Sequence, residues 1–168
     1  MDDISTRISV AVQQDDFDLR AEQATLVAND RGIGAVVAFI GMVRDLNLAD
    51  DVVALELEHY PGMTEKSLTQ IATQAARRWS LQSVRIVHRV GKMYPGDQIV
   101  LVLTASAHRH HAYEANAFIM DYLKTEAPFW KRSGRQKARA GSKPGAVTVP
   151  PQPAGRRMVL MQRMTDIE

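Results

Sequence analysis

The 168-residue sequence contains no cysteine. A disulfide framework, a thiolate zinc site and a cysteine nucleophile or persulfide are therefore excluded on this chain. Any sulfur chemistry would need a sulfur donor from another molecule. Hydrophobic residues make up 45% of the chain, which is enough to bury a core, and the length fits one domain or one domain with a tail.

The sequence also lacks the features of export and of membrane insertion. The first residues, Met1, Asp2 and Asp3, are acidic, and no positively charged start with an apolar stretch follows. No apolar run approaches the length that spans a bilayer. We therefore expect a cytoplasmic protein with no membrane partner.

Acidic residues are absent between Glu126 and Asp166, whereas nine Lys or Arg residues follow from Lys131 onward. After Arg135 the composition shifts to Gly, Pro, Ala and basic residues. We expect one catalytic domain over residues 1–135 and a basic tail over 136–168. A basic tail raises nucleic acid or another acidic partner as an alternative, but the composition favours a solvated, poorly ordered end.

Apolar patterns predict strands at residues 8–12, 34–41, 55–57, 84–90 and 99–105. The run from Gly34 to Gly41 is continuous, which is typical of a strand buried on both faces, and it ends at Met42, Val43 and Arg44. A Pro-Gly turn at 94–97 favours an antiparallel pair of the last two strands.

Helical patterns occupy three other segments. Residues 17–28 predict a short helix, and Thr64 is expected to cap a second helix after the Pro61-Gly62 turn. A third helix begins near His110 and stops near Glu126 before Pro128, so Lys124 lies in its last turn. The second helix carries the clearest apolar stripe, formed by Leu68, Ile71, Ala72, Ala75 and Trp79.

The segment from Thr104 to His111 leaves a strand and enters a helix, where backbone N–H groups and the helix dipole attract anions. Arg109 would strengthen such a site, although Arg109 and His110 are also compatible with simple solvation. His108, His110 and His111 have no carboxylate or thiolate at ligand spacing, so we expect no metal.

Lys124 and Lys131 flank a predicted turn over Ala127–Trp130 that can bring both amines together. Neighbouring cations and partial burial lower the pKa of a lysine, although two ordinary exposed lysines are the alternative. Arg44 is a candidate clamp for phosphate or carboxylate, or else a partner of Asp45 or Asp51. Trp130 is expected to be a core anchor.

Five segments in order resemble the large, catalytic subunit family of molybdopterin synthase. They are GAVVAFIGMVRDLN (34–47), LELEHYPGMTEKSL (55–68), HRVGKMYPGDQIV (88–100), SAHRHHAYEA (106–115) and FIMDYLKTEAPFWKR (118–132). The resemblance implies an α+β fold of the α/β hammerhead type, with a mainly antiparallel sheet and packed helices.

The resemblance also implies a sulfurtransferase that needs no cofactor. Such an enzyme inserts two sulfur atoms into cyclic pyranopterin monophosphate to form the dithiolene of molybdopterin. The sulfur arrives as a thiocarboxylate on the C-terminal Gly-Gly of a small ubiquitin-like subunit. Two large subunits form a homodimer at the centre of a heterotetramer.

By the same resemblance, Lys124 and Lys131 are the catalytic residues. The expected substrate-binding residues are Met42, Val43, Arg44, His108, Arg109, Lys124, Lys131, Arg132 and Ser133. His110 and His111 gain nothing from the resemblance and are expected at the surface.

The sequence departs from the family after Arg132, where Ser133 replaces the usual glutamate and a basic, proline-rich end replaces an acidic one. Divergence of the C-terminal segment and a frame change in the coding sequence are two explanations. Two alternative functions are a dimeric scaffold that binds the small subunit without turnover, and a nucleic-acid-binding module that uses the basic tail.

Overall fold

The computed structural model describes residues 6–44 and 54–131. Arg132, Ser133, the tail at 136–168, Asp45 and Asp51 lie outside these ranges. The elements are β1 (Arg7–Gln13), α1 (Leu19–Val27), β2 (Ala35–Met42), β3 (Leu55–His59), α2 (Met63–Trp79), β4 (Ser83–Arg89), β5 (Gly91–Met93), β6 (Gln98–Ser106), α3 (Arg109–Thr125) and β7 (Phe129–Lys131). Within the described ranges, no helix is long and apolar enough to cross a membrane.

The strands form two sheets. The larger has the order β1-β4-β6-β2, in which only β1 and β4 run parallel. The smaller has the order β5-β3-β7 and is antiparallel throughout. The prediction of an α+β fold with a mainly antiparallel sheet is therefore confirmed. The short strand β5 follows β4 and precedes β6 in the sequence but belongs to the smaller sheet, and it was not predicted.

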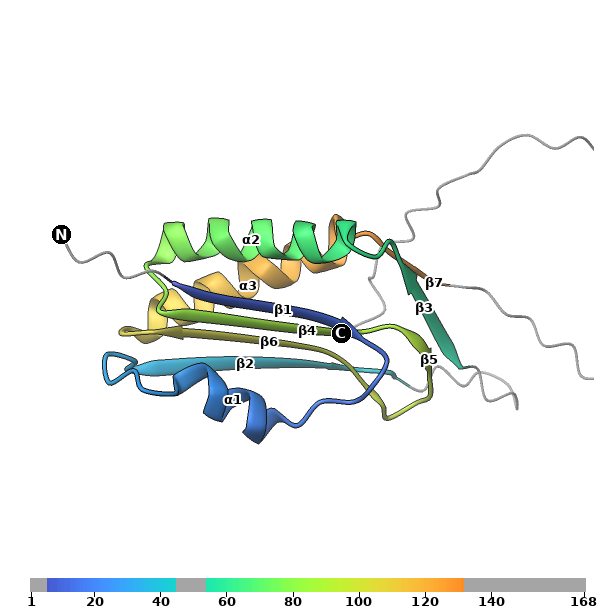
Figure 1. Cartoon of the computed structure of the whole chain (residues 1–168), viewed down its shortest axis with the longest axis horizontal. Coiled ribbons are helices and arrows are strands. Elements are labelled where there is room, and N and C mark those ends of the chain that lie inside the picture. Colours follow the sequence, from blue (N-terminus) through green and yellow to red (C-terminus); the bar gives the residue numbers. More distant parts are fainter. Residues whose placement is uncertain (1–5, 45–53, 132–168) are drawn as a thin grey trace, which may run out of the picture.

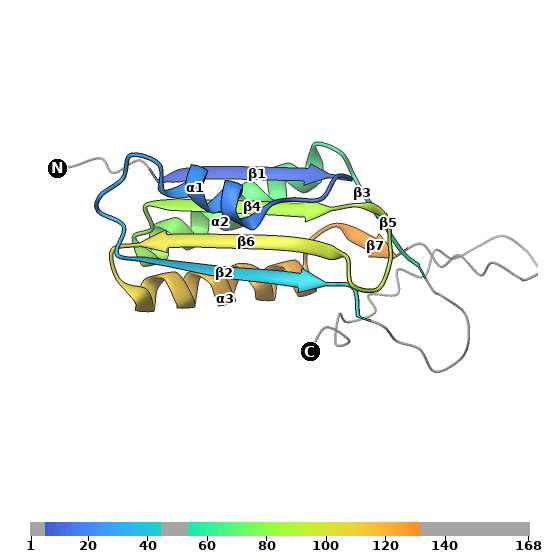
Figure 2. The same cartoon turned by 90° about the horizontal axis from the view of Figure 1, so that it is seen from below.

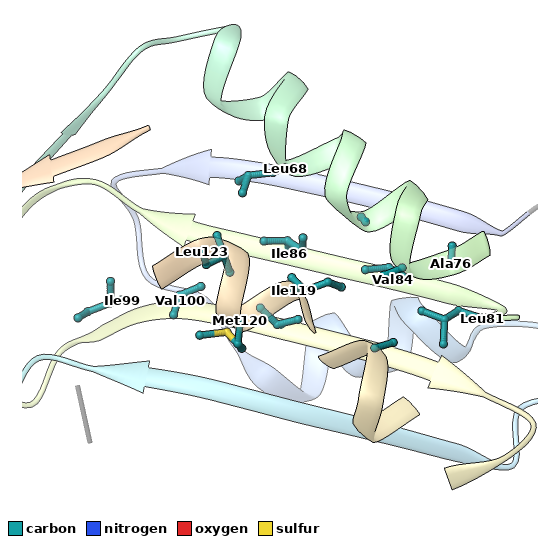
Figure 3. Close-up of a cluster of buried hydrophobic side chains, with 14 of the residues drawn as sticks. Leu68, Ala76, Leu81, Val84, Ile86, Ile99, Val100, Ile119, Met120 and Leu123 are labelled. Carbon is teal, nitrogen blue, oxygen red and sulfur yellow. The ribbon is translucent and has the colours of Figure 1, made fainter. Parts of the chain in front are cut away.

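Helices cover both faces of the larger sheet (Figures 1 and 2). Helices α2 and α3 lie side by side on one face, and α1 lies on the other. The main core is between the sheet and the helix pair, where Leu68, Ile86 and Ile119 are completely buried (Figure 3). The predicted stripe of α2 faces this core, where Leu68, Ala72 and Ala75 are buried and Trp79 packs against them.

The strand β2 corrects one prediction. It was expected to be buried on both faces, but it is an edge strand of the larger sheet, and Ala38 and Met42 are exposed. The apolar run is explained by the helices on the two sides of the sheet, since Phe39 packs toward one cluster and Ile40 toward the other.

The start of α2 corrects a second prediction. The N-cap is Gly62, whose φ of 81° is favoured by glycine, and its N–H donates to Oε2 of Glu65 at 2.7 Å. Thr64 lies inside the first turn, where its hydroxyl donates to the carbonyl of Tyr60 at 3.0 Å. The predicted helix is present, but Thr64 does not cap it.

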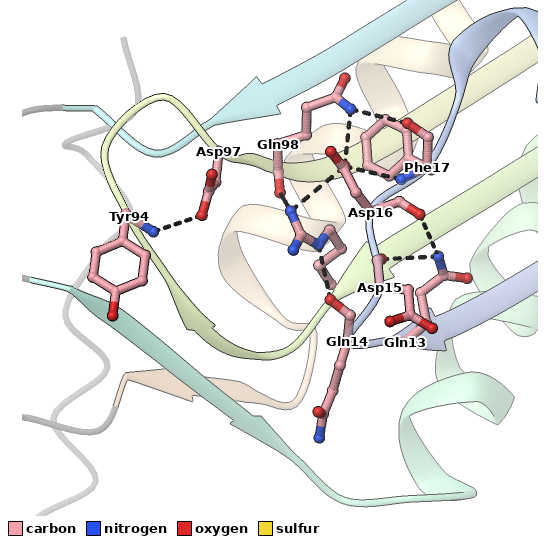
Figure 4. Close-up of polar contacts among 9 residues, drawn as sticks. Gln13, Gln14, Asp15, Asp16, Phe17, Tyr94, Asp97 and Gln98 are labelled. Carbon is pink, nitrogen blue, oxygen red and sulfur yellow. Dashed lines mark hydrogen bonds and ion pairs between the residues drawn. The ribbon is translucent and has the colours of Figure 1, made fainter.

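Polar contacts hold the loops where β6 begins (Figure 4). Oδ2 of Asp97 accepts from the N–H of Tyr94 at 2.8 Å, which closes the predicted turn. Nε2 of Gln98 donates to Oδ1 of Asp16 at 2.9 Å and to the carbonyl of Phe17 at 3.0 Å. These bonds tie the segment between β1 and α1 to the start of β6.

Candidate active site

Most of the predicted site residues lie near one end of the larger sheet. Strand β2 ends beside Arg44, Lys124 lies in the last turn of α3, and Lys131 ends β7. The C-terminal ends of β2 and α3 lie at the same end of the molecule as β7 (Figures 1 and 2). The fold thus brings Arg44, Lys124 and Lys131 to one end, which is called the lysine end below.

Among the residues that the structure describes, the two lysines have no counter-ion. Lys124 is half-buried and Lys131 is exposed. Neither ammonium group forms a hydrogen bond or an ion pair with any residue in the described ranges. Their charges are therefore available to an anionic ligand, and removing either amine breaks no described polar contact.

The residues that precede Arg44 differ in what they present to a ligand. Met42 is 44% exposed, whereas the side chain of Val43 is buried in the main core. The N–H of Val43 donates to the carbonyl of Asp97 at 2.8 Å, and its carbonyl accepts from the N–H of Gly96 at 2.8 Å. Val43 thus holds the turn that begins β6, while Met42 and Arg44 point side chains outward.

His108 and Arg109 lie at the opposite end of the sheet. Within the sheet Met42 pairs with Gln98, and Ala35 pairs with Ser106, which precedes His108 by two residues. At about 3.3 Å per extended residue, the strand β6 separates Arg44 from this pair by roughly 26 Å. At about 1.5 Å per helical residue, α3 separates Arg109 from Lys124 by roughly 22 Å. A single chain does not bring the predicted residues together.

The junction between β6 and α3 has the predicted form. His108 is the N-cap residue of α3, with no side-chain cap, and Arg109 and His110 are exposed. The rings of His108 and His111 meet edge to face at 5.9 Å. The described residues contain no group of three His, Cys, Asp or Glu side chains that could hold a metal ion.

Three stacked rings, one of them in β7, were not predicted from the sequence. The ring of Phe129 lies 3.7 Å from that of His88 with 15° between the planes, and 6.4 Å from that of His59. His88 is 3% exposed, and burial lowers its pKa to about 4. Nδ1 of His59 is buried and has no hydrogen-bond partner in the described part of the chain. Both histidines stood in the segments that carried the family resemblance, but no spacing signalled their stacking.

Trp130 corrects a further prediction. It lies in β7 rather than in a turn, and it is 36% exposed rather than a core anchor. Its ring packs on Tyr60 at 4.5 Å, and its Nε1–H donates to Oε2 of Glu58 at 2.8 Å. The anchor of β7 on the core side is instead Phe129.

A hollow of about 450 Å³ between α1 and the strands β1 and β4 contains none of the predicted site residues. Its charged groups satisfy one another. Nε of Arg85 donates to Oε2 of Glu22 at 2.7 Å, and Arg7 pairs with Asp30 at 3.4 Å. This hollow is therefore a weaker ligand site than the lysine end.

The fold and the lysine end together define a class: an α+β protein with three cationic side chains at one end, suited to a small anionic ligand. The family model of the MoaE protein matches residues 12–126. This range includes Arg44, His108, Arg109 and Lys124, and it stops before Lys131, Arg132 and Ser133. The chain belongs to the MoaE family.

Individual relatives agree with this assignment. The molybdopterin synthase catalytic subunit of Vibrio cholerae is 58% identical over 123 residues, which cover 73% of this chain and 81% of the relative. A molybdopterin cofactor biosynthesis protein E from Burkholderia multivorans has a TM-score of 0.70 at 59% identity, covering 76% of this chain and 84% of that chain. Molybdopterin synthase from Staphylococcus aureus has a TM-score of 0.65 at 31% identity, covering 71% and 86%. The chain is thus an enzyme of molybdenum cofactor biosynthesis and acts as the catalytic subunit of a molybdopterin synthase.

Proposed function

We propose that this chain transfers sulfur from the thiocarboxylated C-terminus of a small ubiquitin-like subunit to cyclic pyranopterin monophosphate, forming the dithiolene of molybdopterin. The relatives named as catalytic subunits imply at least one further subunit. Because the chain has no cysteine, its sulfur must come from a second molecule. The observation that carries the proposal is the pair of lysines at one end of the fold with no described counter-ion.

The charges of the site residues suggest their roles. Lys124 supplies acid–base or electrostatic help as the thiocarboxylate sulfur attacks the pterin side chain, because a positioned cation stabilises the charge that develops there. Water then cleaves the bond between the acyl carbon and the sulfur, which leaves the sulfur on the pterin and a carboxylate on the small subunit. Lys131 stabilises the terminal carboxylate of the small subunit or the charge that develops in the reaction. Arg44, His108 and Arg109 hold the phosphate, which a guanidinium binds bidentately. Roles for Met42, Arg132 and Ser133 in substrate binding, a cytoplasmic location and the domain boundary near residue 135 remain predictions from the sequence.

The separation of these residues within one chain requires a second copy. His108 and Arg109 are roughly 22 to 26 Å from the lysine end by the spacing of helix and strand residues. A phosphorylated pterin is too small to bridge that span. The proposed site is therefore completed by a homodimer in which the lysine end of one copy meets His108 and Arg109 of the partner copy.

Strand β2 offers a surface for this dimer. It is an edge of the larger sheet, and its eight residues, Ala35 to Met42, include no charged side chain. No strand of the described ranges pairs with its outer side. A long apolar edge without charges readily pairs with another strand, so a second copy is the occupant that we propose.

Antiparallel pairing of two β2 strands has the required geometry. It places Met42 of one copy near Ala35 of the partner copy, and Ala35 is paired with Ser106 within its own chain. Strands lie about 4.8 Å apart, so this arrangement reduces the separation between Arg44 and the partner's His108 to roughly 10 Å. The dimer then has two equivalent sites, and each is formed by the lysine end of one copy together with His108 and Arg109 of the partner copy.

The direct test mixes the purified chain with thiocarboxylated small subunit and cyclic pyranopterin monophosphate and measures the dithiolene product, beside Lys124→Ala. Product from the native chain and none from a folded Lys124→Ala variant is the expected result. A fully active Lys124→Ala variant would overturn the assignment of this lysine. Binding of the small subunit by the native chain without any product would favour the scaffold alternative.

A further inference from the structure

The smaller sheet is joined to the larger sheet by aromatic rings. Phe129 of β7 lies flat on His88, the last residue but one of β4. Its partner in the β3–β7 ladder is His59, whose ring is stacked at 6.4 Å with 30° between the planes. The three rings, His88, Phe129 and His59, are called the ring stack below.

The imidazole of His88 is fixed in place and in orientation. Its ring is almost completely buried, and Nδ1 is 2.8 Å from the carbonyl oxygen of Arg89. Because a carbonyl only accepts, Nδ1 carries the proton and donates it, which sets the tautomer. Phe129 therefore packs on a rigid surface supplied by the larger sheet.

Lys131 follows Phe129 by two residues, and alternate residues of a strand point to the same face. The ladder pairs Lys131 with Leu57 and Phe129 with His59, so all four side chains share the face that carries the ring stack. The opposite face carries Trp130, which is bonded to Glu58 and exposed. The buried attachment of this three-residue strand is thus the contact between Phe129 and His88.

We propose that His88 is a positioning residue for Lys131, which it holds at the lysine end through Phe129. The inference rests on the proposed role of Lys131 in sulfur transfer. His88 is buried and does not contact the substrate in the proposed site. It fixes the distance and the angle of β7 relative to the larger sheet, and therefore the position from which the Lys131 amine extends into the site.

A double-mutant cycle tests the coupling in the assembled enzyme with thiocarboxylated small subunit. His88→Ala is expected to lower kcat about tenfold or more, because a displacement of about 1 Å can cost as much as a hundredfold. In a Lys131→Ala background the same change is expected to have less than about a twofold effect, since coupled residues are not additive. An equal loss in both backgrounds would overturn the proposal.

Two further variants separate positioning from general loss of stability. His88→Phe keeps a flat ring under Phe129 and is expected to restore most of the lost kcat. Leu103→Ala opens a cavity in the cluster on the other face of the sheet, where Leu103 is completely buried, and is expected to leave kcat unchanged. Equal losses of kcat in Leu103→Ala and His88→Ala would contradict a specific role for His88.

Hydrogen exchange of the amides at residues 129–131 gives a readout that does not depend on activity. The amides of β7 are expected to exchange at least about tenfold faster in His88→Ala than in the native chain, and at near-native rates in His88→Phe. Unchanged exchange in His88→Ala would overturn the positioning itself. Faster exchange combined with a fully active Lys131→Ala variant would instead overturn the proposed role of Lys131 in the reaction.

Discussion

The ring of Phe129 lies flat on the imidazole of His88, with centroids 3.7 Å apart and planes 15° apart. This contact links β7, which ends at Lys131, to the larger sheet. Because the imidazole of His88 is buried, it affects the pH dependence of folding stability as well as the position of β7.

Stability is expected to fall in acid because of His88. Burial, followed by the nearby His59, lowers its pKa from 6.5 to about 4, and the bond to Arg89 only partly opposes this. The unfolded chain therefore binds a proton between these pH values while the folded chain does not, so stability decreases as the pH falls through this window. The loss is on the order of 3 kcal/mol at about 1.4 kcal/mol per pKa unit.

Urea unfolding at pH 7 and pH 4.5 measures this effect by comparing the native chain with His88→Phe. The phenylalanine variant is expected to lose less stability between the two pH values, because it lacks the titrating ring. Identical pH dependence in the two proteins would show that His88 does not titrate in this window.

The turn before α2 is expected to depend on Gly62. Its φ of 81° lies in the region that disfavours side chains, although a Cβ there would meet no atom within 4 Å. Gly62→Ala should therefore cost about 1 kcal/mol of backbone strain without a steric clash. Met63→Ala, which truncates the neighbouring exposed side chain and leaves Gly62 in place, is the control for thermal unfolding. A loss in Gly62→Ala no larger than in the control would remove the backbone explanation.

The proposed dimer is expected to break when a charge is placed on the β2 edge. Ala38 is exposed in the middle of this strand, and a lysine there introduces the type of residue that blocks edge pairing. Ala38→Lys should yield a folded monomer by sedimentation and lose at least about tenfold in activity. Ala24→Lys on the exposed surface of α1 should remain dimeric and active. A dimeric and active Ala38→Lys variant would exclude this edge as the interface.

Much of the fold was predictable because local patterns determine it. The stripe on α2 and the Pro-Gly turn at 94–97 each predicted an element that the structure contains. The edge position of β2 was not predictable, since an apolar run between two covering layers resembles a central strand until the strand order is known. The strand order also determines which site residues lie at the same end of the sheet.

The sequence names candidate site residues one by one but does not place them in space. Arg44, Lys124 and Lys131 were identified from their segments, and the fold brings them to one end. Their separation from His108 and Arg109 depends on the antiparallel register of β2 and β6, which the sequence does not reveal. The stacking of His88 on Phe129 likewise joins residues from different sheets and has no local signature.

Complementation between two inactive variants tests most directly whether one site is shared by two copies. Lys124→Ala and Arg109→Ala, carried on differently tagged chains, are co-expressed, and the mixed dimer is purified through both tags and assayed with the small subunit. In a symmetric dimer one of the two sites then keeps both native residues, so about half of the native activity is expected. A mixed dimer as inactive as either variant alone would contradict a site assembled from the opposite ends of two chains.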